Sequence, residues 1–433
     1  MARILIATVP ILGHVHPALS IAKELLRRGH EVAWYTGRRY QEAIERIGVE
    51  FWPWMEAADY DDSDFDRQFP ARKGKQGIAK LRFDIRHLFI EPMPGQYRDL
   101  KIIQQLFEAD VLLCDPAFLG SVPLAMEGQE LRIAVFGILP LTITSRDTAP
   151  FGLGLLPGTR PLTKLRDRAL HVLMQKVIFG GLQRRVDALL EDLDMERLPC
   201  FFLDATAQLS DIFLQGTTAS FEYPRSDLPD TVRFIGPILP QPAQTFEPPI
   251  WWAEVMDGSR PIIHVTQGTI ANEDFNRLII PTMQALAEED VWVVASLGRR
   301  PLESLAFALP ANARIVSFIP YDRFLPHVDA MITNGGYGGI QMALMHGVPI
   351  IGAGMSEDKP DVNARLEWSG AGINLRTEAP SPEAIRTAVR RMLQDPGYKG
   401  HAGRLQADFA KHAAVHEACS IVEQLADSRR RGY

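Results

Sequence analysis

The sequence has few cysteines, and none of them stands in a pattern that binds metal or builds a disulfide framework. Cys114, Cys200 and Cys419 are widely spaced and include no C-x-x-C pair. A paired-cysteine zinc site and a small disulfide-stapled secreted domain are therefore not expected. We expect a protein of the reducing cytoplasm.

Long apolar runs and an excess of positive charge are also absent. No stretch of 18 apolar residues occurs, and the apolar start at residues 1–10 is too short for a signal peptide, so we expect no membrane span and no leader. The formal net charge is −7, which leaves no overall electrostatic footprint for nucleic acid. The composition predicts a soluble protein without a nucleic-acid partner.

Two further motifs are missing from the loops where they would be needed. The stretch Thr8-Val-Pro-Ile-Leu-Gly13 follows the first expected strand and lacks the G-x-G-x-x-G of a nicotinamide-dependent oxidoreductase. No Asp-x-Asp pair stands at a strand end, and we expect the acidic stretch at 61–64 to be solvated rather than to bind a cation. We therefore expect neither a metal nor a bound cofactor.

Alternating strand and helix patterns fill the first half of the chain. At 433 residues, 46% hydrophobic and 23% charged, the chain is expected to form two globular domains. The apolar patterns predict a helix over 17–28 and strands over the ranges 3–9, 31–36, 111–114 and 133–136. This alternation is typical of a parallel sheet with helices on both faces.

The same alternation begins again after a proline-rich segment. Residues 234–252 contain five prolines and no helical period, which is typical of a semi-rigid linker. Beyond it we predict a helix over 275–287 and strands over the ranges 261–266, 291–296, 313–318 and 330–333. We expect an N-terminal domain over 1–235, a linker over 236–252, a second doubly wound domain over 253–402, and a last helical stretch, 403–433, that returns to the first domain.

A run of glycines follows the strand predicted to end at Thr333. Gly335, Gly336, Gly338 and Gly339 let the backbone approach a ligand closely, and the helix predicted after them leaves its first amides unpaired. Those amides and the helix dipole favour an anion, so the segment is interpreted as a diphosphate cradle. A purely structural glycine turn is the alternative.

Three motifs follow one another along the chain: Gly-His-Val-His-Pro at 13–17, Gln-Gly-Thr at 267–269, and the segment 318–372 that contains the cradle, Gly-Val-Pro at 347–349 and Asn-Ala at 363–364. In their order and spacing they resemble the family 1 glycosyltransferases, particularly the bacterial enzymes that glycosylate small hydrophobic natural products. The resemblance implies the GT-B fold, α/β with two facing Rossmann-like domains and an interdomain cleft. It also implies inverting, metal-independent transfer of a hexose from a UDP- or dTDP-sugar to a hydroxyl of a small hydrophobic acceptor.

The resemblance assigns a catalytic pair to His14 and Asp115. A neutral imidazole can take the proton of an attacking hydroxyl, and a carboxylate behind the ring would hold its tautomer. Structural interpretations stay open: His14 as a turn histidine bonded to backbone, Asp115 as a helix N-cap before Pro116. His16 competes for the role of base but is expected to be a wall or capping residue.

The residues that bind the nucleotide-sugar donor are assigned by the same resemblance. They are Gly13, Gly268, Thr269, Ile319, Asn334, Gly335, Gly336, Gly338, Gly339, Asp358 and Lys359. Ile319 could equally be core, and Asp358 a solvated loop charge. The acceptor residues rest on composition and not on the resemblance: Phe118, Phe136 and Phe151 could line an apolar, aromatic pocket, although such residues are usually core in a domain of this size.

The chain departs from the family at three donor positions. Asn334 replaces a histidine that contacts phosphate, Gly339 replaces a serine or threonine, and Met342 replaces a glutamate that grips the ribose. The nucleotide is therefore left open, and the sugar is left open because Asp358-Lys359-Pro360 stands where the family has an acidic-Gln pair. The losses also keep open a non-catalytic nucleotide-sugar-binding or helper protein, and a nucleotide-sugar hydrolase or epimerase would use the same cleft.

Overall fold

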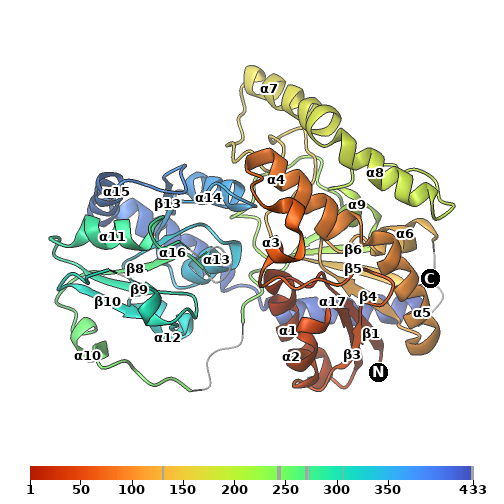
Figure 1. Cartoon of the computed structure of the whole chain (residues 1–433), viewed down its shortest axis with the longest axis horizontal. Coiled ribbons are helices and arrows are strands. Elements are labelled where there is room, and N and C mark those ends of the chain that lie inside the picture. The colour runs from red at the N-terminus through yellow and green to blue at the C-terminus, as the bar shows by residue number, and fades with distance from the viewer. Residues whose placement is uncertain (129–130, 241–244, 269–271, 273, 306, 431–433) are drawn as a thin grey trace.

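The computed structural model, which describes residues 1–128, 131–240, 245–268, 272, 274–305 and 307–430, contains two separate parallel sheets (Figure 1). The first sheet has the strand order β3-β2-β1-β4-β5-β6-β7 and the second β10-β9-β8-β11-β12-β13. In each sheet the chain adds strands first on one side of its starting strand, β1 or β8, and then on the other. This places a topological switch point between β1 and β4 and another between β8 and β11. The predicted fold class, two doubly wound α/β units, is confirmed.

The strands of the first sheet are β1 (Arg3–Ala7), β2 (Glu31–Thr36), β3 (Glu50–Pro53), β4 (Val111–Cys114), β5 (Arg132–Gly137), β6 (Ile212–Gln215) and β7 (Val232–Phe234). Those of the second are β8 (Ile262–Thr266), β9 (Trp292–Ser296), β10 (Ala313–Val316), β11 (Ala330–Thr333), β12 (Ile350–Gly352) and β13 (Gly372–Asn374). Every predicted strand is present, with ends shifted by at most two residues.

Each sheet is buried on both faces. In β1, Ile4 and Ile6 belong to one core cluster, and Leu5 and Ala7 belong to the cluster on the opposite face. Successive residues of a strand point to opposite faces, so a strand buried on both sides must be apolar throughout. This is why the central strands read as continuous apolar runs.

The helices before the linker are α1 (Leu12–Arg27), η1 (Arg38–Tyr40), α2 (Gln41–Glu45), α3 (Phe65–Gln68), η2 (Pro70–Arg72), α4 (Gly77–Asp84), the π-helix η3 (Ile85–Ile90), α5 (Met93–Phe107), α6 (Ser121–Met126), α7 (Pro161–Val172), the π-helix η4 (Leu173–Ile178), α8 (Gly180–Glu191) and α9 (Ala205–Leu209). The later ones are α10 (Trp252–Val255), α11 (Ile279–Leu286), η5 (Leu302–Ser304), α12 (Tyr321–Phe324), η6 (Leu325–His327), α13 (Tyr337–Met345), α14 (Lys359–Trp368), α15 (Pro382–Gln394), α16 (Pro396–Phe409) and α17 (Ala414–Arg430). None of the described helices has the length and apolar character needed to cross a bilayer.

The first helix begins earlier than the sequence predicted. We expected it to start at Pro17, because the apolar residues have helical spacing from there to Arg28. Instead α1 starts at Leu12 and contains Pro17 in its interior, so the Gly-His-Val-His-Pro motif is helical rather than a loop. The start of α11 was also predicted too early: we expected it at Phe275, and the helix begins at Ile279.

The last two helices belong to different halves of the molecule. Helix α16 packs against α13, and its Ala402, Leu405 and Phe409 lie in the core of the second domain. Helix α17 crosses to the first sheet, where Ala418 and Val422 join the core beneath β4 and β5, and Figure 1 shows it running behind that sheet. The predicted single stretch from 403 is therefore two helices, and the return begins only after Phe409.

Candidate functional site

His14 and Asp115 meet at the switch point of the first sheet. His14 lies in the first turn of α1, directly after β1, and Asp115 is the first residue after β4, the strand next to β1. The His14 Nδ1 and the Asp115 Oδ1 are 2.8 Å apart. The carboxylate is fully buried, and the imidazole keeps only a small exposed surface.

Backbone amides fix the Asp115 carboxylate in place. Its Oδ2 accepts a hydrogen bond from the Val9 N–H at 2.8 Å, and its Oδ1 accepts one from the Ala117 N–H at 2.8 Å. The pairing interpretation of Asp115 describes a real contact, whereas the N-cap interpretation is wrong, because residues 116–119 form a turn and the next helix, α6, begins only at Ser121. A carboxylate that already accepts two N–H bonds accepts a third from His14 Nδ1–H, which leaves the His14 Nε2 as an acceptor.

Asp62 supports the same helix turn, a role that no local sequence pattern indicates. Its Oδ2 accepts hydrogen bonds from the Leu12 N–H and from the Tyr40 hydroxyl, each at 2.8 Å. Its Oδ1 lies 3.0 Å from the Arg39 Nε. The expectation that the acidic stretch is solvated is wrong for Asp62, because the N-terminal amides of α1 need a buried acceptor.

No group of three or more metal-ligand side chains occurs among the residues that the structure describes.

The second domain faces this site through Arg299. Partial desolvation and the positive charge of Arg299 lower the pKa of His16, while Asp62 opposes them. Arg299 follows β9, has a left-handed backbone (φ 71°), and places its guanidinium carbon 4.7 Å from the centroid of the half-exposed Phe318 ring. His16 of the first domain and Arg299 of the second therefore lie within electrostatic reach of each other.

The glycine run forms the N-terminus of α13 at the switch point of the second sheet. The helix begins at Tyr337, directly after β11, with Gly336 as its N-cap. An added Cβ at Gly336, Gly338 or Gly339 would meet nothing within 4 Å. The helix start is thus open, and its first amides have space in front of them for an anion.

Two predicted donor residues serve the protein's own structure. Gly335 has φ 94°, and an added Cβ would lie 2.5 Å from the Asn363 side chain, so this glycine allows α14 to pack closely. The Asn334 side chain donates to the Gln267 carbonyl at 2.6 Å, which ties the loop after β11 to the loop after β8. One N–H of the Asn334 amide therefore serves the backbone, and a contact of this residue with a phosphate stays a prediction.

The other donor residues fall into different environments. Gly268 has φ 72° and its N–H donates to the Thr266 hydroxyl at 3.2 Å, whereas Thr269 lies outside the described residues. Gly13, in the first turn of α1, has open space around its Cα. Ile319 is buried in the core cluster beside α13, so its donor assignment is corrected: the strand end turns it inward, and the preceding Phe318 is the exposed side chain.

Asp358 and Lys359 lie at the N-terminus of α14. Burial raises the pKa of the Asp358 carboxyl to about 6, and the charge of Lys359 offsets part of the shift. The Lys359 Nζ forms an ion pair with Glu357, a residue with a left-handed backbone. Asp358 is only partly exposed, and its role toward the sugar stays a prediction.

The predicted acceptor phenylalanines do not form a pocket. Phe118 and Phe136 are fully buried on opposite faces of the first sheet, so their acceptor assignment is corrected to core. Phe151 is half-buried and lines a cavity of about 10 Å³ beneath η4, too small for an organic acceptor. Apolar periodicity could not separate these outcomes, because core and ligand-facing aromatics look alike in sequence.

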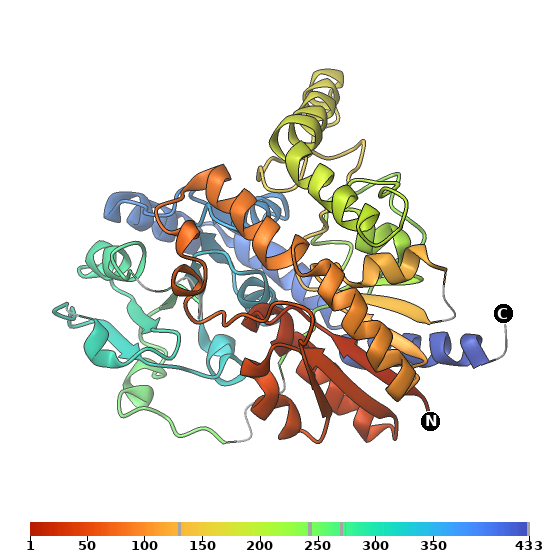
Figure 2. The same cartoon turned by 45° about the vertical axis from the view of Figure 1, so that its right-hand side comes forward.

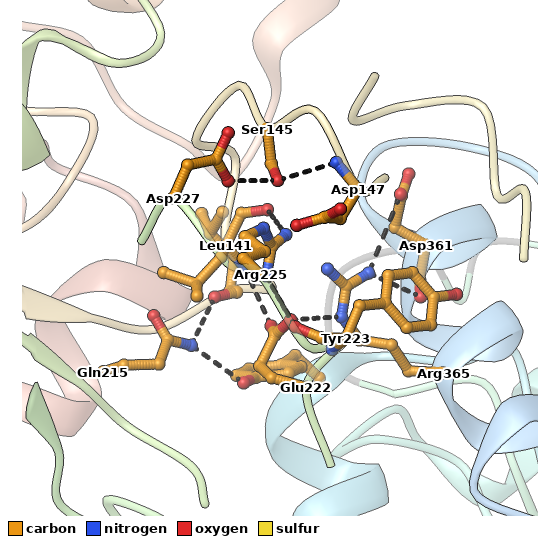
Figure 3. Close-up of polar contacts among 12 residues, drawn as sticks. Leu141, Ser145, Asp147, Gln215, Glu222, Tyr223, Arg225, Asp227, Asp361 and Arg365 are labelled. Atoms are coloured by element: carbon orange, nitrogen blue, oxygen red, sulfur yellow. Dashed lines mark hydrogen bonds and ion pairs between the residues drawn. The ribbon is translucent and has the colours of Figure 1, made fainter. Parts of the chain in front are cut away.

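Helix α14 also holds the first domain (Figure 3). The Gly152 N–H donates to the Asp361 Oδ2 at 2.6 Å, which joins the loop after β5 to the donor half. The Arg365 Nε donates to the Glu222 Oε2 at 2.9 Å. Phe221, next to Glu222, packs in the core of the second domain. A buried junction therefore joins the two halves directly behind Asp358 and Lys359.

Comparison with known proteins supports the resemblance. Residues 281–425 match the model of the family "Erythromycin biosynthesis protein CIII-like, C-terminal domain". The chain is 42% identical over 424 residues to 4'-demethylrebeccamycin synthase of Lentzea aerocolonigenes, which covers 98% of this chain and 99% of that protein. It is 35% identical over 441 residues to UDP-glycosyltransferase 2 of Phaeomoniella chlamydospora, covering 98% and 94%.

Solved structures share the fold at lower identity. The glycotransferase of kitacinnamycin superposes with a TM-score of 0.74 at 21% identity, covering 98% of both chains. A spinosyn rhamnosyltransferase complexed with thymidine diphosphate gives 0.67 at 18% identity, covering 98% and 99%. Taken with the relatives that match along nearly their whole length, these likenesses establish that the chain belongs to the family 1 bacterial natural-product glycosyltransferases and is a sugar-transferring enzyme of the GT-B fold.

Proposed function

We propose that this enzyme is an inverting, metal-independent transferase that moves a hexose from a UDP- or dTDP-sugar to a hydroxyl group of a small hydrophobic acceptor. The observation that carries the proposal is the 2.8 Å contact between His14 and Asp115 at the switch point of the first sheet. A base that is held by a buried carboxylate serves a reaction in which a hydroxyl group must lose its proton. A protein that only binds nucleotide sugar has no need of such a pair.

The two residues have separate roles in the proposed reaction. The His14 Nε2 takes the acceptor proton while the acceptor oxygen forms a bond to the anomeric carbon and the bond from that carbon to the diphosphate breaks. Attack opposite the leaving diphosphate inverts the anomeric centre. Asp115 is a positioning residue: it holds the Nδ1–H tautomer and stabilises the imidazolium without being protonated itself.

The leaving diphosphate would bind at the start of α13. The free amides of Gly338 and Gly339, together with the helix dipole, stabilise the negative charge that grows as the bond breaks. Neither glycine presents a side chain that would obstruct the phosphates. The sugar would then lie toward Asp358 and Lys359 at the start of α14.

Relatives named as UDP-glucosyltransferases and a neighbour complexed with thymidine diphosphate support these two nucleotides as the first choices. The relative named for 4'-demethylrebeccamycin and neighbours named for spinosyn and calicheamicin support a natural-product acceptor. All three cysteines are free, which fits our proposal of a cytoplasmic enzyme.

The proposal is tested by incubating the purified protein with UDP-glucose or dTDP-glucose, each with and without a panel of flavonoid, macrolide and steroid acceptors and the precursor of 4'-demethylrebeccamycin. Nucleotide release and product mass are followed together. Release that depends on acceptor, with a gain of one hexose, supports the transferase and identifies its donor. Release without acceptor would mean hydrolysis, and donor binding without release would mean a binding or helper role.

A further inference from the structure

Helix α7 and the π-helix η4 form a continuous arm, residues 161–178, that projects from the first domain (Figures 1 and 2). Its inner side is held by Asp167 and Met174, which are buried, and by Ile178, which packs in the cluster under the arm. The arm is therefore a fixed part of the domain with one side turned outward.

The outward side of the arm is apolar. Five large apolar residues there have exposed fractions between 44% and 79%: Leu162, Leu165, Val172, Leu173 and Val177. The spacing from Leu162 to Leu165 and on to Val172 follows the helical period, so these side chains share one face. A helix of a soluble domain normally turns such a face inward, and an exposed apolar stripe of this kind marks an interaction surface.

Positive charge surrounds the stripe. Arg166 lies one turn after Leu162, and Arg168 lies one turn after Leu165, on opposite sides of the stripe. Lys164, Arg166 and Arg185 pair with acids, whereas Arg168 and Lys176 make no ion pair with any residue that the structure describes. The exposed face thus combines apolar side chains with two cations, Arg168 and Lys176, that have no ion-pair partner among the described residues.

The charge extends beyond the arm. Residues 67–86 and 160–185 together hold fourteen lysines and arginines and two acidic residues. The rest of the chain holds 32 lysines and arginines and 51 acidic residues. The two segments are neighbours, because Leu81 and Ile85 share a core cluster with Met174 and Leu182. In Figure 2 α4 and α7 lie on the same side of the first domain. Arg72, Arg86 and Arg185 pair with acids, and the other cations leave a local basic excess on a chain whose net charge is −7.

We propose that the arm docks this enzyme onto an anionic lipid surface, with the apolar stripe in the interfacial region and the flanking cations against the headgroups. Apolar side chains flanked by lysine and arginine are the pattern of helices that lie in a membrane interface. Two copies of this chain would bring two basic arms together, and this repulsion favours the lipid over a second copy. The surface would hold the enzyme where hydrophobic compounds accumulate.

The test is cosedimentation of the full-length chain with vesicles of phosphatidylcholine alone or with three parts in ten of phosphatidylglycerol. We expect binding to the anionic vesicles, at least tenfold weaker binding to the neutral ones, and a further loss in 0.5 M salt. The double substitution Leu165→Glu and Val172→Glu should reduce binding at least tenfold. Matched controls are Ile102→Glu and Leu106→Glu, exposed on α5.

A second pair of variants isolates the charge. Arg168→Glu with Lys176→Glu should abolish binding to anionic vesicles, whereas Lys399→Glu with Arg404→Glu, an equal charge change on exposed residues of α16, should not. Unchanged thermal unfolding midpoints would show that each variant is folded. The proposal is overturned by equal binding of arm and control variants, by no binding of the wild type to anionic vesicles, or by an arm-dependent dimer in sedimentation velocity without vesicle binding.

Discussion

Glu222, on the loop after β6, and Arg365, on α14, form a buried ion pair between the two domains, with the Arg365 Nε 2.9 Å from the Glu222 Oε2. The Glu222 Oε1 accepts from the Leu141 N–H at 2.9 Å, and the Arg225 guanidinium also pairs with the carboxylate (Figure 3). Burial alone would raise the pKa of Glu222, but the charges of Arg365 and Arg225 hold it below its usual value. The junction is therefore ionic as well as apolar.

Replacing Glu222 with Gln should destabilise the protein by about 3 kcal/mol, because the buried Arg225 guanidinium would lose its counter-charge and Arg365 would keep only its 3.7 Å pair with Asp361. The measurement is guanidinium chloride unfolding followed by tryptophan fluorescence. Glu42→Gln, which removes an exposed pair with Arg46, is the control and should change stability by less than about 0.5 kcal/mol. Equal effects of the two substitutions would show that the junction contributes little.

His14→Ala should reduce kcat by about 10²- to 10⁴-fold and leave the donor dissociation constant unchanged, because the base acts on the acceptor. Steady-state kinetics and donor titration calorimetry measure the two quantities separately. The same measurements on His16→Ala provide the comparison within one helix. Turnover like that of the wild type in His14→Ala would remove this residue from the mechanism, and a larger loss in His16→Ala would transfer the role to His16.

Gly338→Val and Gly335→Ala should have opposite consequences. The first adds a side chain in open space at the start of α13, so we expect normal thermal stability and donor binding at least tenfold weaker. The second adds a Cβ against Asn363 at a left-handed position, so we expect a lower unfolding temperature. Unchanged donor affinity in a folded Gly338→Val protein would refute the diphosphate cradle.

His264 should make the second domain sensitive to acid. Burial lowers the pKa of this β8 imidazole from 6.5 to about 4, although its hydrogen bond to the Val294 carbonyl opposes the shift. Between these values the unfolded chain binds more protons than the folded one, so the stability contribution is complete above pH 6.5 and is lost as the pH falls toward 4. The advantage of the wild type over His264→Asn in free energy of unfolding should shrink by about 3 kcal/mol from pH 7.5 to pH 4. A constant difference would contradict the neutral buried imidazole.

The sequence was sufficient for features that depend on neighbouring residues. The strands were found because a strand buried on both faces must be apolar along its length, and the run from Gly335 to Gly339 revealed a helix start because only glycine leaves that turn open. Helix starts were less certain: α1 begins at Leu12 because Asp62, 50 residues away, accepts its first amide. A local pattern could not contain that partner.

What only the tertiary structure decided is which of these residues meet. The contact between His14 and Asp115 spans 101 positions, and the one between Glu222 and Arg365 spans 143. Phe118, Phe136 and Ile319 proved to be core, and the outer leucines of α7 proved to be exposed, because the packing of neighbouring elements determines burial. Spacing along the chain determines which face of a helix or strand is apolar. Whether that face is buried or exposed depends on elements that are far away in sequence.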